Sequence, residues 1–291
     1  MRRSDRVRQA FLTTAARIPW PVWMPAAALA SVAMAVLPAR PLRQWQANVA
    51  ALTGDRPGRL HTARAVWSWA RNTVESMHLG SWSRERIDDY AIFSTEDEHR
   101  LRSLAADPGA VIGLPHMGSW DLAGAWACGA GMPVSTVAEQ LLAPEFALFR
   151  RVRENLGFIV HGHREASVTS ALVDESRQGR LVCLMADRDF SRRGVPVVWP
   201  GATGGVTATM PTGPATIALR AGAVLLGVAC HYQGRRMRLV VSQPITPPEG
   251  ADHETAVAAM TQGLCDFFAD QVRRHPHDWH MLQPIFPGVR A

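Results

Sequence analysis

The sequence predicts an α/β fold in which a mixed central sheet is flanked by helices. From residue 110 onward, short β-rich runs alternate with helical stretches, which is typical of a sheet covered on both faces. The 291 residues and the hydrophobic content of 47% suffice for one large core. Residues 1–105 carry mainly helical patterns. We therefore expect a helical N-terminal region over 1–105 and an α/β core over 106–291, joined in one continuous domain.

The first expected element is an interfacial segment at residues 18–37. This stretch has no charged residue, but three of its first eight residues are proline, which leaves only 26–37 as good helix. That length is too short to cross a hydrocarbon layer of roughly 30 Å. Trp20 and Trp23, together with flanking arginines, are typical of a helix that lies in the headgroup layer of an anionic membrane. The composition equally fits a helix packed on the protein's own core.

Glycines and prolines set the ends of the next helices. Gly54 and Gly80 suit the residue that follows a helix, and Ser94 suits the residue before one. Pro108-Gly109 ends the third helix. The expected helices are 42–52, 60–79 and 95–105.

The core is expected to alternate strands with helices. β-branched and apolar runs predict strands at 110–114, 134–138, 158–161, 181–186, 195–199, 224–229 and 237–242. Helical patterns fall at 121–130, 144–156, 165–177 and 211–221, and an amphipathic helix at 254–273 precedes the tail.

The tightest motif pairs His116 with Asp121, with four residues between them, where an apolar strand gives way to a helix. A histidine oriented by a carboxylate can take a proton from a hydroxyl while nearby backbone N–H groups stabilise an oxyanion. This arrangement favours acyl-transfer chemistry. On spacing alone, a helix cap beside a structural histidine explains the motif better.

A second candidate carboxylate is Asp187, which follows the apolar run 181–186. The carboxyl ends of strands face the ligand crevice of an α/β sheet, so Asp187 could meet His116 there and orient its imidazole. The alternative is a surface turn in which Arg188 pairs with its neighbouring aspartates. The residues leave open whether Asp121 or Asp187 orients His116.

The charge pattern restricts the partners. The formal net charge is +6 and no lysine occurs, so every basic side chain other than histidine is arginine, which suits phosphate groups. We expect no nucleic acid, because zinc-finger spacing, RNA-binding aromatic motifs and a concentrated basic helix are missing. The glycines near residue 204 lack the lysine of a phosphate-binding loop, which excludes that class of nucleotide site. An anionic membrane surface or a phosphate-bearing molecule remains.

Metal and disulfide sites are not expected. His161 with His163, and the histidines of 275–280, lack a standard zinc spacing. Four widely spaced cysteines in apolar segments indicate reduced core residues and favour a cytoplasmic location. Neither a metal nor a cofactor is therefore expected.

Six motifs in order resemble the actinobacterial phosphatidylinositol mannoside acyltransferases, part of the wider family that includes the lipid A lauroyl and myristoyl acyltransferases. The resemblance covers about residues 100–286, with a looser likeness from about residue 40. The motifs are Leu114–Asp121, Thr136–Glu139, Arg153–Gly157, Cys183–Asp189, Met210–Ala215 and His275–Pro284.

The resemblance implies a glycerolipid acyltransferase fold and an acyl-CoA-dependent O-acyltransferase, peripheral on the cytoplasmic face of the plasma membrane. Acyl-CoA would be the co-substrate, and a mannose hydroxyl of a membrane glycolipid, phosphatidylinositol mannoside, would be the acceptor. His116 then corresponds to the general base and Asp121 to its motif partner. Asp187 stands where the family usually has glutamate, and Glu139 and Arg153 match positions that line the site.

The substrate site is also expected to include Ser119, Trp120 and Arg188. Arginines 150, 151, 153 and 188 are candidates for phosphates of coenzyme A or phosphoinositol. Ser119 lacks the GxSxG elbow of a serine nucleophile, so the acceptor hydroxyl itself is expected to attack.

The sequence departs from the family at several positions and leaves two alternative functions open. The family commonly has asparagine at Ser119, arginine at Gln140, and an acid followed by two phenylalanines near 198–200. These departures bear on the acceptor, which could be a lysophospholipid or another glycolipid. A non-catalytic lipid-binding homologue is the other alternative, and the presence of both His116 and Asp121 argues against it.

Overall fold

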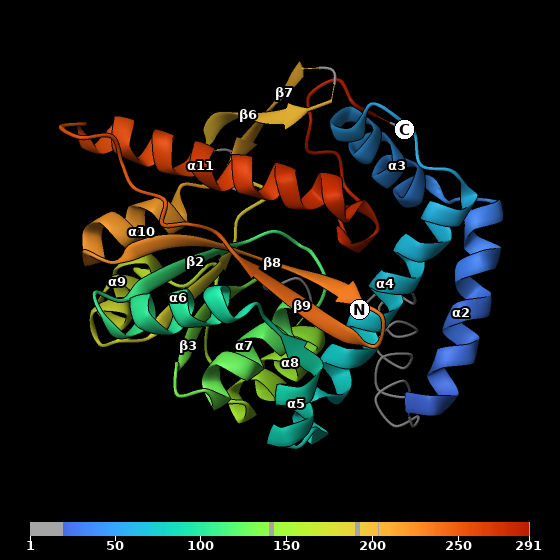
Figure 1. Cartoon of the computed structure of the whole chain (residues 1–291), viewed down its shortest axis with the longest axis horizontal. Coiled ribbons are helices and arrows are strands. Elements are labelled where there is room, and N and C mark those ends of the chain that lie inside the picture. The colour runs from blue at the N-terminus through green and yellow to red at the C-terminus, as the bar shows by residue number, and fades with distance from the viewer. Residues whose placement is uncertain (1–19, 140–142, 190–192, 203, 291) are drawn as a thin grey trace.

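The computed structural model describes residues 20–139, 143–189, 193–202 and 204–290. Within them, a seven-stranded sheet forms the centre of the protein, in the order β1-β9-β8-β2-β5-β3-β4 (Figure 1). All neighbouring strands run parallel except β8 and β9, which are antiparallel. The expected mixed sheet is thus confirmed. The strands are β1 (Ala91–Ile92), β2 (Ala110–Leu114), β3 (Val134–Ala138), β4 (Ile159–Gly162), β5 (Leu181–Met185), β8 (Val224–Gln233) and β9 (Arg236–Val241).

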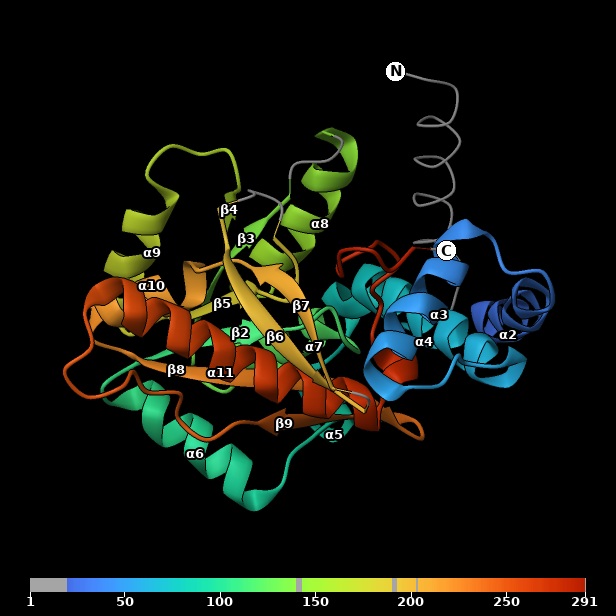
Figure 2. The same ribbon diagram turned by 90° about the horizontal axis from the view of Figure 1, so that it is seen from above.

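The central strands are apolar on both faces because helices cover both sides of the sheet. Every residue of β2 is buried; Val111 packs in one hydrophobic cluster, and Ile112 packs in the other. On the Val111 side lie α9 (Val168–Arg177), α10 (Gly213–Ala221) and α11 (His253–Arg274), as Figures 1 and 2 show for α10 and α11. The Ile112 side is covered by α5 (Arg84–Tyr90), α6 (Thr95–Ala106) and α7 (Trp120–Gly129). The remaining helix of the core, α8 (Ala143–Asn155), contacts β4.

The register of β2 and β5 positions the site. Leu114 is paired with Met185 at the carboxyl ends of these parallel strands. His116 and Asp187 each follow two residues later, so Asp187, 71 positions further along the chain, returns to the level of His116. The loops that carry these side chains therefore both begin at the carboxyl ends of the parallel strands.

Three helices lie at the N-terminal side of the protein. They are α2 (Trp20–Val36), α3 (Arg40–Thr53) and α4 (Arg59–His78), and α2 lies along α4 in both views (Figures 1 and 2). The helix α3 packs against α11 and β6 (Val195–Gly201) of the core. The expected break of the helix before residue 26 is wrong, because α2 continues through Pro25. Pro25 removes the hydrogen bond to the carbonyl four residues earlier, and its ring crowds that carbonyl, but the helix continues on both sides of it.

The helix α2 does not meet the requirements of a membrane-spanning helix by itself. Among residues 20–290 that the structure describes, no single helix is both long and apolar enough to cross a membrane. Residues 25–36 and α3 pass such a test only as a pair, and they are bent by 76° relative to each other.

A separate hairpin corrects the expectation for residues 195–210. β6 (Val195–Gly201) and β7 (Gly204–Met210) pair with each other in an antiparallel two-stranded sheet beside α11. The strand expected at 195–199 therefore exists but lies outside the main sheet, and the strand at 204–210 was not expected. Gly205 lies within the strand, where a Cβ atom would approach the Val198 side chain to 2.2 Å. The short elements α5 and β1 were not expected either.

Candidate active site

His116 and Asp187 form a hydrogen-bonded pair at the ends of β2 and β5. The Nδ1 atom of His116 lies 2.6 Å from Oδ1 of Asp187, and the His116 backbone N–H donates to Oδ2 at 2.9 Å. The Asp187 side chain is fully buried, whereas 27% of the His116 side chain is exposed. With Nδ1–H donated to the carboxylate, the free lone pair of the neutral ring lies on Nε2. This is the arrangement of a general base held by a carboxylate.

Trp279 completes the surroundings of the Asp187 carboxylate. Its indole Nε1–H donates to Oδ2 of Asp187 at 2.9 Å. Burial disfavours the charged carboxylate, but His116 and the hydrogen bonds from His116 and Trp279 outweigh burial and lower the pKa of Asp187. Asp187 is therefore ionised at neutral pH and can stabilise a protonated His116. From the sequence, Trp279 belongs to one of the six motifs and is expected to pack a C-terminal turn, but no contact with the site is expected of it.

The C-terminal loop around Trp279 also fixes the backbone of the histidine loop. The N–H of His280 donates to the carbonyl of His116 at 2.7 Å, and the N–H of Gly118 donates to the carbonyl of Asp278 at 2.9 Å. Gly118 has a φ of 58°, and a Cβ there would come within 2.5 Å of the Cys230 carbonyl oxygen. The turn after His116 therefore requires glycine.

Asp121 does not contact His116. Its carboxylate accepts from Arg153 of α8, at 2.7 Å from Nε and 3.3 Å from the second guanidinium nitrogen. The pair is largely buried, and the negative charge of Asp121 raises the pKa of Arg153 against the opposing effect of burial. The structure thus brings Asp187 to His116 and leaves Asp121 as the partner of Arg153. Because Arg153 is engaged by Asp121, it is a poorer candidate for a substrate phosphate than the sequence suggested.

The backbone amides beside His116 are already used. Those of His116 and Gly118 donate as described above, Met117 donates to the Pro115 carbonyl, and Ser119 donates to the sulfur of Met237. These N–H groups therefore do not form the oxyanion site expected from the sequence. Within the described part of the chain, no acceptor is seen for the amides of Trp120 and Asp121 in the first turn of α7.

Ser119 and Trp120 have different environments. The Ser119 side chain is buried, and its hydroxyl has no hydrogen-bond partner among the described residues, so it neither caps α7 nor contacts His116. Trp120 packs edge-on against the His116 ring, with the centroids 5.6 Å apart. Trp120 therefore borders the site, whereas Ser119 does not reach it.

Glu139 and Arg188 approach each other at the edge of the site. One Arg188 guanidinium nitrogen lies 3.9 Å from a Glu139 carboxylate oxygen, and Glu139 is exposed. Burial lowers the pKa of Arg188, against the effect of Asp187 and Glu139. Asp187 itself is fully buried against His116 and Trp279, so it does not lie in the surface turn that was the alternative.

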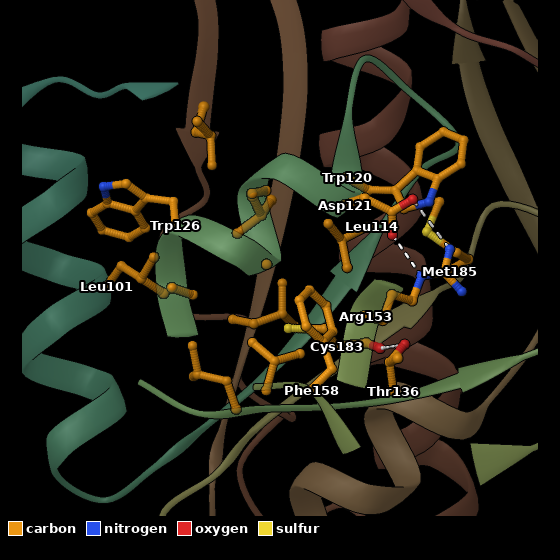
Figure 3. A pocket seen from close by; sticks show the side chains of 18 of the residues that line it. Leu101, Leu114, Trp120, Asp121, Trp126, Thr136, Arg153, Phe158, Cys183 and Met185 are labelled. Carbon is orange, nitrogen blue, oxygen red and sulfur yellow. Dashed lines mark hydrogen bonds and ion pairs between the residues drawn. The ribbon is translucent and has the colours of Figure 1, made fainter. Parts of the chain in front are cut away.

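An apolar cavity begins beside the pair and extends between α7 and the face of the sheet formed by β3, β5, β2, β8 and β9. It has about 690 Å³ of space between atoms, its open mouth included. Leu114, Met185 and Trp120 line it near the site, and Figure 3 shows Asp121 with Arg153 at one end and Leu101 with Trp126 at the other. The remaining lining is almost entirely apolar, and sequence reasoning missed it. The alternating side chains of the strands at 134–137 and 181–185, which line this cavity, were the signal in the sequence that could have predicted it.

The remaining histidines have other contacts. His161 lies between Glu165 and Glu175. His280 contacts the Ser68 hydroxyl, and burial, with the neighbouring His116, lowers the pKa of His280 to about 3. Within the described residues, no three His, Cys, Asp or Glu side chains are arranged to hold a metal ion.

Comparison with known proteins places these features in a family. Residues 9–287 match the family model described as bacterial lipid A biosynthesis acyltransferase. A phosphatidylinositol mannoside acyltransferase of Mycolicibacterium smegmatis is 36% identical over 83% of the chain and 78% of the relative. Proteins of the same name from two Mycobacterium tuberculosis strains are 42% identical over 64% of the chain, which spans only 57% of their length. With the match covering nearly all of its length, the chain belongs to the bacterial lipid A biosynthesis acyltransferase family, as the six motifs predicted.

Proposed function

We propose that the protein transfers a long-chain acyl group from acyl-CoA to a mannose hydroxyl of phosphatidylinositol mannosides, as a peripheral protein on the cytoplasmic face of the plasma membrane. The observation that carries this proposal is the His116–Asp187 pair at the end of an apolar cavity. Membership of the family and the names of the relatives support the reaction class and the acceptor. The arginine-rich composition suits phosphate-bearing substrates.

In the proposed mechanism, Nε2 of His116 takes the proton of the acceptor hydroxyl as its oxygen attacks the thioester carbonyl. Asp187 stabilises the resulting imidazolium and holds the ring by Nδ1. The tetrahedral intermediate then expels the coenzyme A thiolate, which receives the proton from His116. Atoms and charges balance without a covalent acyl-enzyme. The acyl chain would lie in the cavity, because its lining offers hydrocarbon almost everywhere.

The oxyanion needs a donor other than the amides of residues 116–119. We assign this role to the first-turn amides of α7, at Trp120 and Asp121, which lie at the positive end of the helix dipole. Trp120 borders both His116 and the cavity, so a carbonyl that enters between them would pass this turn.

The direct test is His116→Ala, assayed with palmitoyl-CoA and a phosphatidylinositol mannoside acceptor. We expect kcat to fall by about 10²–10⁴-fold, the usual contribution of a general base. His253→Ala, which alters an exposed histidine at the start of α11, is the matched control and should keep wild-type activity.

Activity of His116→Ala within about tenfold of wild type would contradict the base assignment. Transfer to a lysophospholipid or another glycolipid, with none to mannolipid, would keep the mechanism and replace the acceptor. Wild-type protein that binds lipid but shows neither transfer nor thioester hydrolysis would identify a non-catalytic homologue.

A further inference from the structure

A second apolar cavity lies on the other side of the catalytic loop, between the N-terminal helices and the C-terminal loop. It has about 620 Å³ of space, its open mouth included, and shares no lining residue with the first cavity. Residues of α2, α3, α4 and 279–282 line it, and among the described residues His280 supplies the only ionisable side chain of this lining. The proposed reaction makes no use of this cavity.

The cavity has a buried floor and an exposed mouth. Its floor is formed by Trp45 and Trp279, which are 1% and 0% exposed and are joined by a 2.9 Å hydrogen bond from the Trp45 indole to the Trp279 carbonyl. At the mouth, Met34 and Trp69 are each more than two-fifths exposed. A chain that enters from the mouth therefore ends against Trp279, whose indole holds Asp187.

The surface beside the mouth is apolar on α2. Along this helix and just after it, large side chains are exposed, among them Leu29 at 74% and Leu37 at 85%. Exposed apolar surface that continues into an apolar cavity suits a hydrocarbon ligand that comes from a lipid layer.

A basic depression adjoins the same mouth. Arg40 and Arg290 line it, and it shares Pro41 and Leu282 with the cavity. Both arginines are exposed, neither forms an ion pair with a described residue, and no acidic side chain lines the depression. Guanidinium groups at this position match a phosphate group next to a hydrocarbon chain.

We propose that the cavity and the basic depression together bind one anionic phospholipid of the membrane, with a hydrocarbon chain in the cavity and the phosphate at Arg40 and Arg290. The chain end, not the headgroup, points toward Trp279. This lipid is therefore not the acceptor of the proposed reaction, and its site does not depend on which acceptor the protein acylates. The bound chain would pack against the residue that anchors Asp187.

Photo-crosslinking of the full-length protein on vesicles tests this site. The probe is phosphatidylglycerol with a diazirine near the end of one acyl chain, and cross-linked residues are identified by mass spectrometry. We expect cross-links at Trp45, Ala65 or Val66, which are buried in the cavity. Ala39→Trp, which adds an indole at the mouth, should reduce them by about fivefold or more, whereas Ala26→Trp on the exposed part of α2 should not.

The headgroup is tested with charge variants. Arg40→Gln combined with Arg290→Gln should lower cross-linking by phosphatidylglycerol about fivefold or more, and cross-linking by phosphatidylcholine, whose phosphate is compensated by the choline cation, much less. Arg59→Gln combined with Arg64→Gln removes the same charge from exposed positions of α4 and is the control. Cross-links confined to exposed residues such as Leu29, equal cross-linking by both lipids, or no effect of Ala39→Trp would each overturn the proposal.

Discussion

Two regions next to His116 each carry an aspartate, and they use it differently. At the end of β5, the fully buried Asp187 carboxylate receives hydrogen bonds from His116 and Trp279. In the first turn of α7, Asp121 receives them from Arg153. Asp121 is five positions from His116 in sequence and Asp187 is 71 positions away. Strand register, not closeness in sequence, therefore decides which carboxylate serves the histidine.

The largest expected effect comes from Asp187→Asn. An asparagine amide that faces Nδ1 favours the tautomer with the proton on Nε2, which removes the base, and it no longer stabilises the imidazolium. We expect kcat to fall by about 10³-fold, with an altered pH profile. The measurement is the pH dependence of acyl transfer.

The control for this variant is Asp189→Asn in the same loop. The Asp189 carboxylate accepts from the Gly194 N–H, so its loss should affect the loop without affecting the histidine. If Asp187→Asn keeps activity within about tenfold of wild type, Asp187 is not the orienting group.

The sequence could predict that Asp187 lies near His116, because this follows from the pattern of apolar strands. An apolar run that ends at residue 186 predicts that Asp187 follows the carboxyl end of a buried strand. In this fold class, the carboxyl ends of neighbouring parallel strands, here β5 and β2, lie side by side. The choice between Asp121 and Asp187 could not be made, because it depends on the register Leu114–Met185 and on Arg153 reaching Asp121 from α8. Neither is visible as a local pattern.

Trp279 and the β6–β7 hairpin show why other features escaped prediction. Trp279 lies 92 positions after Asp187, in a C-terminal loop without a regular sequence pattern, and its indole donates to the Asp187 carboxylate. The hairpin contains prolines and glycines that are typical of loops, and its stability comes from tertiary packing, because Trp199 is buried against Trp279 and Phe268. Local propensity is a poor guide where distant packing decides the structure.

A smaller effect is expected from Trp279→Phe, which keeps an aromatic ring but removes one donor from Asp187. A hydrogen bond to a charged group contributes about 1.5–3 kcal/mol, so we expect a lower free energy of unfolding by about 2 kcal/mol and about tenfold lower kcat. The matched control is Trp199→Phe. Its ring centroid lies 5.8 Å from that of Trp279, it is equally buried, and its indole N–H has no partner among the described residues. Equal losses of kcat in the two variants would show that Trp279 acts through packing alone.

The smallest effect on the chemistry is expected at Asp121 and Arg153. Asp121→Asn leaves the guanidinium of Arg153 buried without its counter-charge, which should lower the free energy of unfolding by about 3 kcal/mol. The activity of the folded protein should fall only a few-fold, about 2–5-fold, with an unchanged pH profile, because Asp121 does not contact His116.

Adding Arg153→Met to Asp121→Asn should restore part of the stability, since it removes the unpaired charge. Denaturant unfolding of both single variants and the double variant measures this coupling, and kcat of each variant reports the chemistry. A loss of kcat as large as that of Asp187→Asn, with the pH profile changed in the same way, would place Asp121 in the proton transfer and remove the distinction between the two regions.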